Sequence, residues 1–182
     1  MGGFSEEGER KIRVNEVKAF PIPFTLGEIN NNISISTDTH SKPTKKQLIA
    51  LAFNFHSEGN IKQAIKYYEY FIKNDFKDHR VFSNYASILK DLGKLKEAEN
   101  SYRKAIELKP DYADAHSNLG NILNDLGNLQ DAELSYRKAI EIRPDYAEAH
   151  SNLGSILSDL GNLQDAESYT RKAIEIKPNY AE

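Results

Sequence analysis

Side chains that carry both a hydrogen-bond donor and an acceptor recur at a fixed spacing in this sequence. The hexapeptide AHSNLG occupies residues 115–120 and returns, unchanged, at residues 149–154. It places Asn118 and Asn152 34 residues apart, and Asn84 lies one more period before them. An Asn amide both donates and accepts, so it can pair with the backbone of a bound chain whatever that chain's side chains are. The row therefore suits an extended peptide held by its main chain.

The sequence contains no recognisable catalytic or metal-binding pattern. His116 and His150 hold equivalent places in successive periods, so they form a row, whereas a zinc site needs ligands that converge on one point. We expect these histidines to pack or form hydrogen bonds, with metal binding the lesser alternative. No Ser lies in a nucleophile-elbow sequence, and the inter-helix glycines are single residues rather than a phosphate-binding loop. Cysteine is absent. The sequence predicts no enzyme, no metal and no cofactor.

Three Arg-Lys pairs recur with the same period and could suggest a nucleic-acid stripe. Each Arg has a Glu four residues before it and another four after it, and on a helix these are ion-pair neighbours worth roughly 0.2–0.5 kcal/mol each. The whole chain holds 24 basic and 27 acidic residues, a net charge of −3, which gives no general attraction to nucleic acid or membrane. We expect a solvated outer face at Arg103-Lys104, Arg137-Lys138 and Arg171-Lys172.

The overall composition bounds the class of protein. The 182 residues allow one domain with or without a tail, and 39% apolar against 28% charged residues suits an elongated array with much surface. No apolar run approaches the roughly 18 residues of a membrane span, and the start, MGGFSEEGERK, lacks the apolar segment of a signal peptide. A cytoplasmic protein is the default expectation.

The repeat extends beyond AHSNLG. Residues 113–146 and 147–180 agree at 26 of 34 positions, and residues 79–112 agree with 113–146 at 20 of 34. Residues 45–78 diverge but keep the frame. A period of this length is typical of a solenoid, because one such unit cannot bury its own apolar faces. The sequence predicts four units, at 45–78, 79–112, 113–146 and 147–180.

Each unit has the pattern of two helices. In the third unit Asp111 is predicted to cap a first helix that ends at Gly127, since Gly adopts the left-handed conformation without penalty. Asn128 is predicted to start the second helix, which Pro144 ends. Thr44 with Gln47, and Asn60 with Gln63, supply capping boxes in the first unit. Gly120 and Ala132 let the two helices approach, and Tyr136 fills the gap between neighbouring units.

These features resemble the tetratricopeptide repeat (TPR) over residues 45–180. The family's signature has leucine, small, aromatic and proline positions. In the third unit these are Leu119, Gly120, Leu123, Ala132, Tyr136, Ala139 and Pro144. The resemblance implies an all-α, right-handed α-solenoid. Two departures predict looser packing: Phe76 stands at a Pro position, and Thr170 stands at the Tyr position, with Tyr169 displaced one residue earlier.

The resemblance also implies a ligand site. In TPR proteins one stripe of each first helix lines a concave groove, and the array of O-linked N-acetylglucosamine transferase uses an Asn row there. A groove that clamps a carboxylate is disfavoured, because Lys46 and Arg80 are the only cations on the stripe and the third and fourth units supply Asp and Glu. The predicted ligand-binding residues are Asn84, Asn118, Asn152, Ser87, Asn121, Ser155, Ser117, Ser151, Arg80 and Phe53. The alternative is that the Asn side chains are solvated or bond to the neighbouring helix.

The two ends of the chain differ from the units. Residues 1–44 have no 34-residue counterpart and are predicted to be a mostly disordered leader. The alternative is that Phe20, Ile22 and Phe24 fold onto the first unit. Residues 181–182 continue as a further unit would begin, so we expect a truncated piece of a longer protein, or a last helix that finds a partner.

The predicted function is a scaffold that binds a protein or peptide in its concave groove. A second hypothesis, drawn from bacterial TPR arrays, is the targeting arm of a larger glycosyl-, sulfo- or methyltransferase. A third is a structural element that self-associates through the last helix. The identity of the partner is not encoded in any of these patterns.

Overall fold

The structure, a computed structural model, describes residues 43–178. The predicted leader therefore lies outside the described residues except for Pro43 and Thr44, as do residues 181–182.

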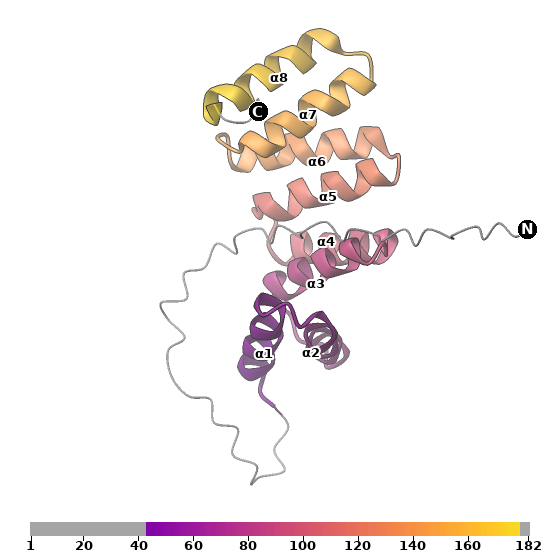
Figure 1. Cartoon of the computed structure of the whole chain (residues 1–182), viewed down its shortest axis with the longest axis vertical. Helices are drawn as coiled ribbons and strands as arrows, with labels where there is room; N and C mark the ends of the chain where they lie inside the picture. The colour runs from indigo at the N-terminus through magenta and orange to yellow at the C-terminus, as the bar shows by residue number, and fades with distance from the viewer. Residues whose placement is uncertain (1–42, 179–182) are drawn as a thin grey trace, which may run out of the picture. The chain divides into compact units, whose positions relative to one another are not determined.

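Eight α-helices make up the described part of the chain, and they pair in chain order (Figure 1). This all-α arrangement of tandem helix pairs confirms the predicted fold class. The pairs are α1 (Lys45–Ser57) with α2 (Ile61–Lys73), α3 (His79–Asp91) with α4 (Leu95–Leu108), α5 (Ala113–Asp125) with α6 (Leu129–Ile142), and α7 (Ala147–Asp159) with α8 (Leu163–Ile176).

The turn inside each pair contains a glycine in the left-handed region. Gly59, Gly93, Gly127 and Gly161 have φ between 72° and 82°, a conformation that side chains with a Cβ rarely adopt. The predicted helix end at Gly127 is confirmed. Three residues thus suffice to reverse the chain and bring the second helix back along the first.

Helix starts follow the predicted capping only in part. Thr44 and Gln47 form the predicted box, with each side chain bonded to the other residue's backbone N–H, and the Asn60 side chain accepts from the Gln63 N–H. The prediction for Asp111 is wrong, because α5 begins after Tyr112 and has no side-chain cap. Asn128 does precede α6, but its side chain makes no capping bond.

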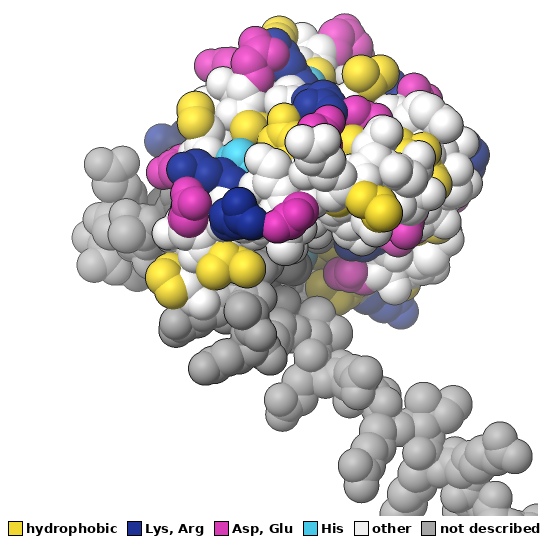
Figure 2. Space-filling view, turned by 90° about the horizontal axis from the view of Figure 1, so that it is seen from above, with side chains coloured by type: hydrophobic (Ala, Val, Ile, Leu, Met, Phe, Trp, Pro, Cys, Tyr) yellow, Lys and Arg dark blue, Asp and Glu magenta, His cyan; other side chains and the backbone are white. Residues whose placement is uncertain are grey.

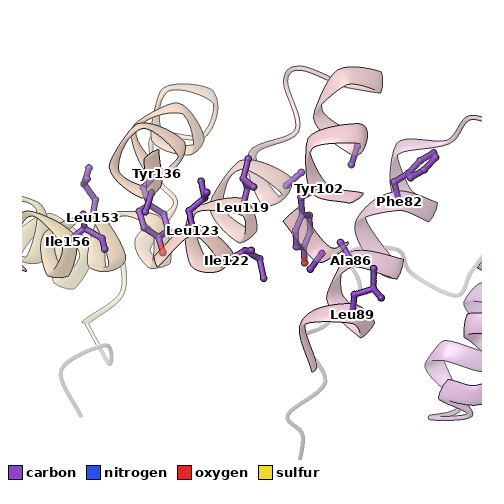
Figure 3. Close-up of a cluster of buried hydrophobic side chains, with 14 of the residues drawn as sticks. Phe82, Ala86, Leu89, Tyr102, Leu119, Ile122, Leu123, Tyr136, Leu153 and Ile156 are labelled. Carbon is purple, nitrogen blue, oxygen red and sulfur yellow. The ribbon is translucent and has the colours of Figure 1, made fainter. Parts of the chain in front are cut away.

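A buried tyrosine fills the space beside each of the first three pairs. Tyr68, Tyr102 and Tyr136 are 0–2% exposed, and Figure 3 shows Tyr102 and Tyr136 among the apolar side chains of the core. A Cβ added to Gly120 would lie 2.6 Å from Cε1 of Tyr136, so the glycine gives the ring its place. The predicted burial of Tyr136 is therefore confirmed, and what the absence of a side chain at Gly120 allows is the close approach of this ring.

The stack is joined by apolar residues that recur on the first helices. Ile88, Ile122 and Ile156 are 0–1% exposed, and each belongs to an apolar cluster that includes residues of the pair before it. In α1 the same repeat position holds Asn54, which is exposed. The face of α1 at the start of the array is thus polar, as a solvent-facing end requires.

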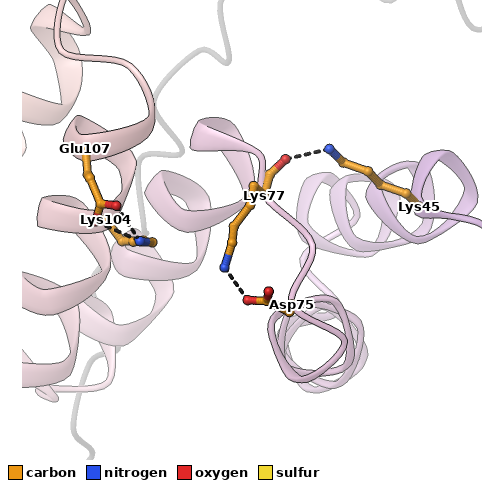
Figure 4. Close-up of polar contacts among 5 residues, drawn as sticks. All are labelled: Lys45, Asp75, Lys77, Lys104 and Glu107. Carbon is orange, nitrogen blue, oxygen red and sulfur yellow. Dashed lines mark hydrogen bonds and ion pairs between the residues drawn. The ribbon is translucent and has the colours of Figure 1, made fainter.

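The junction between the first two pairs is weaker than the others. α2 contacts α3 less extensively than α4 contacts α5 or α6 contacts α7, which confirms the looser packing predicted from Phe76. Without proline, five residues connect α2 to α3, and Asp75 adopts a φ of 57°. Polar contacts take part in holding this turn: Lys77 pairs with Asp75, and Lys45 Nζ donates to the Lys77 carbonyl at 2.5 Å (Figure 4).

The looser packing predicted from Thr170 is wrong. α7 and α8 contact each other at least as extensively as the other pairs do. A Cβ on Gly154 would lie 2.4 Å from Thr170 Oγ1 and 3.1 Å from the Ala166 carbonyl oxygen. With a small side chain in place of the tyrosine ring, the two helices remain in close contact.

The outer side of α8 keeps an exposed apolar stripe. Leu163 is 67% exposed and Ile174 40% exposed, whereas their counterparts Leu129 and Ile140 pack against the core between α6 and α7. In α8 these two apolar side chains thus lie exposed among polar and charged residues.

Because Ile122 is buried between two pairs and Asn54 is not, alanine has different effects at this one repeat position. Ile122→Ala is expected to lower the free energy of unfolding by about 2–5 kcal/mol. Asn54→Ala, the matched control, is expected to change it by less than about 0.5 kcal/mol. Urea denaturation followed by circular dichroism at 222 nm measures both. Equal losses of unfolding free energy would show that Asn54 is packed inside the folded chain rather than exposed to solvent.

Candidate functional site

Two rows of polar side chains run along the first helices α3, α5 and α7. We call Asn84, Asn118 and Asn152 the amide row, and Ser87, Asn121 and Ser155, three residues further along each helix, the second row. Ser155 is exposed and the other five are half-buried. A half-buried amide can be fixed by the protein on one side and still be open to a ligand on the other.

Asn121 is held by hydrogen bonds from two helices. The Tyr136 hydroxyl of α6 donates to Asn121 Oδ1 at 2.7 Å, and Asn152 Nδ2 of α7 donates to the same oxygen at 3.0 Å. The carbonyl end of Asn121 is thereby fully used. Within residues 43–178 neither Asn121 Nδ2 nor Asn152 Oδ1 has a hydrogen-bond partner, so one donor and one acceptor remain side by side.

The other buried tyrosines contact the two rows in a similar way. Ser87 lies beside the Tyr102 hydroxyl, and Asn84 beside that of Tyr68, which also bonds His56 Nδ1 at 3.1 Å. Burial raises the pKa of Tyr68, Tyr102 and Tyr136 well above the usual range for a phenol. The hydroxyls thus stay protonated, and each can support a polar side chain of the candidate site.

The prediction that Ser117 faces a ligand is wrong. Ser117 is fully buried, because Tyr146, at the end of the α6–α7 connection, lies beside its hydroxyl. Ser83 is 6% exposed beside Tyr112 in the same way. Ser151 is half-buried, and the tyrosine that would correspond in the next period lies outside the described residues.

Sequence reasoning missed these covering tyrosines. Tyr112 and Tyr146 each follow the Pro-Asp that ends a unit, so their period was visible. Their position over the preceding first helix could not be predicted from the sequence, since it depends on how one pair stacks on the next.

Charged side chains lie at the start of α3 and at the start of α5. Arg80 donates to Asp78 through Nε at 3.0 Å and Nη2 at 2.8 Å, and its guanidinium lies 5.8 Å from the centre of the Phe53 ring. The structure thus brings together Arg80 and Phe53, two of the predicted site residues. On the middle helix α5, Asp114 accepts two hydrogen bonds of 3.0 Å from Arg143, which follows α6.

The outer face is largely neutralised by ion pairs, as expected. Each Arg of the Arg-Lys pairs bonds the Glu four residues before it, while the Lys, not the Arg, takes the Glu on the other side. Figure 2 shows Lys and Arg beside Asp and Glu over the end of the array that bears α8.

The repeated histidines bond backbone oxygens. His116 Nε2 lies 2.9 Å from the Pro110 carbonyl and His150 Nε2 lies 2.8 Å from that of Pro144. In residues 43–178 no three His, Asp or Glu side chains are grouped as a metal site would need. No helix in that range is long and apolar enough to span a membrane.

Comparison with known proteins identifies the repeat that this chain contains. Family models described as "TPR repeat" match residues 86–127 and 120–161, and one described as "Tetratricopeptide repeat" matches residues 147–180. Together they cover just over half of the chain. The Hsp70-Hsp90 organising protein of Plasmodium falciparum is 33% identical over 72 residues, which is 40% of this chain and 29% of that protein.

Solved structures agree with the fold. MamA superimposes with a TM-score of 0.70 at 25% identity, over 76% of this chain and 81% of that one. YrrB, described as a TPR protein with an unusual peptide-binding site, superimposes with a TM-score of 0.69 at 22% identity, over 76% of this chain and 71% of that one.

The raised phenol pKa values predict a loss of stability in alkali. Unfolded tyrosines ionise near pH 10, whereas the buried ones keep their protons, so the free energy of unfolding falls as pH rises above about 10. Each buried phenol contributes up to about 1.4 kcal/mol per pH unit. Urea midpoints measured from pH 8 to 11 should fall less steeply for Tyr102→Phe/Tyr136→Phe. The exposed Tyr70→Phe is the control, and slopes equal to the unmodified protein's in both variants would contradict the assignment.

Proposed function

The chain belongs to the tetratricopeptide-repeat family, and we propose that it is an interaction scaffold that holds an extended protein segment along α3, α5 and α7. The amide row and the second row would contact the segment's backbone. Tyr136 acts as a positioning residue, because its hydroxyl fixes the orientation of Asn121.

The observation that carries this proposal is the unused donor and acceptor of the Asn121–Asn152 pair. An extended chain presents N–H and C=O groups at intervals of about 3.3 Å, and neighbouring helices pack about 8–10 Å apart. Roughly three residues of ligand would therefore span each helix pair, with one pair of backbone groups meeting each amide. Such contacts fix the path of the ligand with little demand on its sequence.

The relatives support a role in protein interaction. YrrB is described by its peptide-binding site, and the Plasmodium protein by the two chaperones that it organises. This chain spans less than a third of the latter, so the support extends to the kind of function and not to the partners.

The hypothesis of a transferase targeting arm uses the same face. Its catalytic residues would lie outside this chain, and the amide row would hold the protein substrate. Under this hypothesis residues 43–178 would still bind an extended protein segment along α3, α5 and α7.

Loss of the amide row is expected to weaken binding without unfolding the array. The bait is the purified chain, and the ligands are random 12-residue peptides on phage, from which binders are selected. Asn84→Ala/Asn118→Ala/Asn152→Ala should reduce the affinity of the selected peptides at least tenfold, because each amide supplies bonds to the ligand backbone. Fluorescence polarisation with labelled peptides measures the affinity.

The matched control removes three asparagines elsewhere. Asn100, Asn128 and Asn162 are exposed, and the latter two make no capping bond, so their joint change to Ala should leave the affinity unchanged. Equal loss of affinity in both triple variants, or a lower thermal midpoint in the amide-row variant, would show that the row is structural.

A second candidate function, self-association, is favoured by the exposed stripe of α8. Leu163 and Ile174 resemble the residues that join pairs inside the array, and exposed apolar area of this kind tends to be covered in a complex. Association of two chains through α8 would bury both stripes.

Light scattering between about 5 and 500 µM tests this candidate. The mass is expected to double with concentration, and Leu163→Glu/Ile174→Glu should remove the increase. Leu134→Glu, at a leucine of α6 that is 65% exposed, is the control. A monomer at every concentration would exclude self-association.

A further inference from the structure

The connections that lead into α5 and α7 each carry a tyrosine that covers the pair before it. Tyr112 and Tyr146 are the residues directly before these two helices, and each lies beside a serine hydroxyl of the preceding first helix. Those serines, Ser83 and Ser117, are 6% and 0% exposed. In the second and third pairs a tyrosine therefore closes the surface next to the amide row.

The first pair lacks this tyrosine. One period before Tyr112, the residue directly before α3 is Asp78, which has no ring. Its carboxylate accepts the Arg80 backbone N–H at 3.0 Å and two further bonds from the Arg80 guanidinium. The residue that corresponds to Ser83 is Ile49, which is half-buried rather than buried. Asp78 is thus held at the start of α3 and supplies no ring to cover Ile49.

The surface around Ile49 continues the two rows of the candidate site. Ala50 occupies the repeat position of the amide row and Phe53 that of the second row, so both rows extend onto α1 with apolar side chains. We call Ile49, Ala50 and Phe53 the apolar patch; all three are half-buried. The Phe53 ring lies 6.2 Å from the centre of the Tyr68 ring, and the Tyr68 hydroxyl lies beside Asn84. The apolar patch and the first amide of the row are therefore neighbours.

We infer that the bound segment carries a phenylalanine side chain that packs on the apolar patch, in the place that Tyr112 and Tyr146 take in the following pairs. This rests on the proposed peptide-binding function and adds a side chain that the partner must supply. A phenyl ring is favoured over a phenol because Ile49 stands where the later pairs have a serine. A hydroxyl packed on Ile49 would lack the hydrogen-bond partner that Ser83 gives to Tyr112.

The apolar patch would also set the register of the bound segment. The amides repeat at each pair, so backbone contacts alone would let the segment shift along the rows by one step. Roughly three residues of an extended chain span one helix pair, which places the phenylalanine about three residues from the one that meets Asn84. Only α1 offers apolar side chains at the positions of both rows, so the ring fixes which part of the segment meets which pair.

The experiment starts from the random 12-residue peptides on phage that are selected on the whole chain. The selected peptides are expected to share a phenylalanine, and changing it to Ala should weaken binding about tenfold, because the ring loses its burial on the apolar patch. Fluorescence polarisation with labelled peptides measures both affinities. Selected peptides that depend on the amide row but share no phenylalanine would overturn the inference, while the proposed function stands. If no peptide can be selected, the proposed function is wrong and this inference with it.

Variants of the chain test where the phenylalanine binds. Ile49→Ser/Asp78→Tyr gives the first pair the serine and tyrosine of the next two, so the chain's own ring should cover the patch and remove the preference for the Phe peptide over its Ala version. Phe53→Ser, which removes apolar surface without adding a ring, should have the same effect. Asp78→Asn is the matched control: it keeps a capping oxygen and adds no ring, so the preference should stay within about twofold of its original value.

The ratio of the two affinities is the readout, since a general loss of stability would weaken both peptides alike. An unchanged ratio in either variant, with helicity retained in circular dichroism, would overturn the inference. The chain's own Phe20, Ile22 and Phe24, which lie outside the described residues, are tested by changing all three to Ser in the whole chain. The affinity for the Phe peptide is expected to stay the same. A gain of about tenfold would show that the chain itself occupies the patch, and the inference would again be overturned.

Discussion

The array depends on a tyrosine ring packed into the space between two helices of a pair and the pair that follows. Gly120 makes room for Tyr136, and Tyr68 and Tyr102 are as fully buried in the earlier pairs. A helix hairpin of some 30 residues cannot bury enough apolar area alone, so each ring stabilises two pairs at once. The phenol has a second effect, because its hydroxyl must find a partner once it is buried. At Tyr136 that partner is Asn121, so the same residue that stacks the array also orients an amide of the candidate site.

The first and last helix pairs of the described array depart from the packing of the middle pairs. α1 places Asn54 where later helices have isoleucine, and the array meets solvent with a polar face. The connection after α2 lacks proline, and its turn relies on Lys45, Lys77 and Asp75 instead of close helix contact. At α8 the ring is replaced by Thr170 and the apolar stripe remains exposed. The described array therefore has less extensive packing between its first two pairs and two exposed apolar side chains on its last helix.

In the candidate site the amide side chains repeat from pair to pair, whereas the charged side chains do not. The amides repeat with the helices, so they offer similar backbone contacts at each step. Charge does not repeat, because Arg80 and Lys109 stand where later pairs have an acid and a base.

Most of the fold could be predicted from the sequence. The 34-residue period, the glycines at the turns and the apolar spacing gave eight helices in pairs, since these signals are local and repeat several times. Parts of the site could be predicted as well: Asn121, Asn152, Arg80 and Phe53 lie where the period placed them.

The errors and omissions concern contacts between units. Ser117 was assigned to the ligand face because it falls on the polar stripe of its helix, but it is fully buried beside Tyr146 from the next connection. Asp111 was assigned as a cap, although the helix starts two residues later, at Ala113, and Tyr112 takes the cap position. The bonds that join Asn121 to Asn152 and Arg143 to Asp114 link residues about 30 positions apart. The sequence by itself determined which residues recur, and hence the helices and their order. Only the tertiary structure decided which recurring polar groups are buried and which remain open, because that depends on side chains from an adjacent pair.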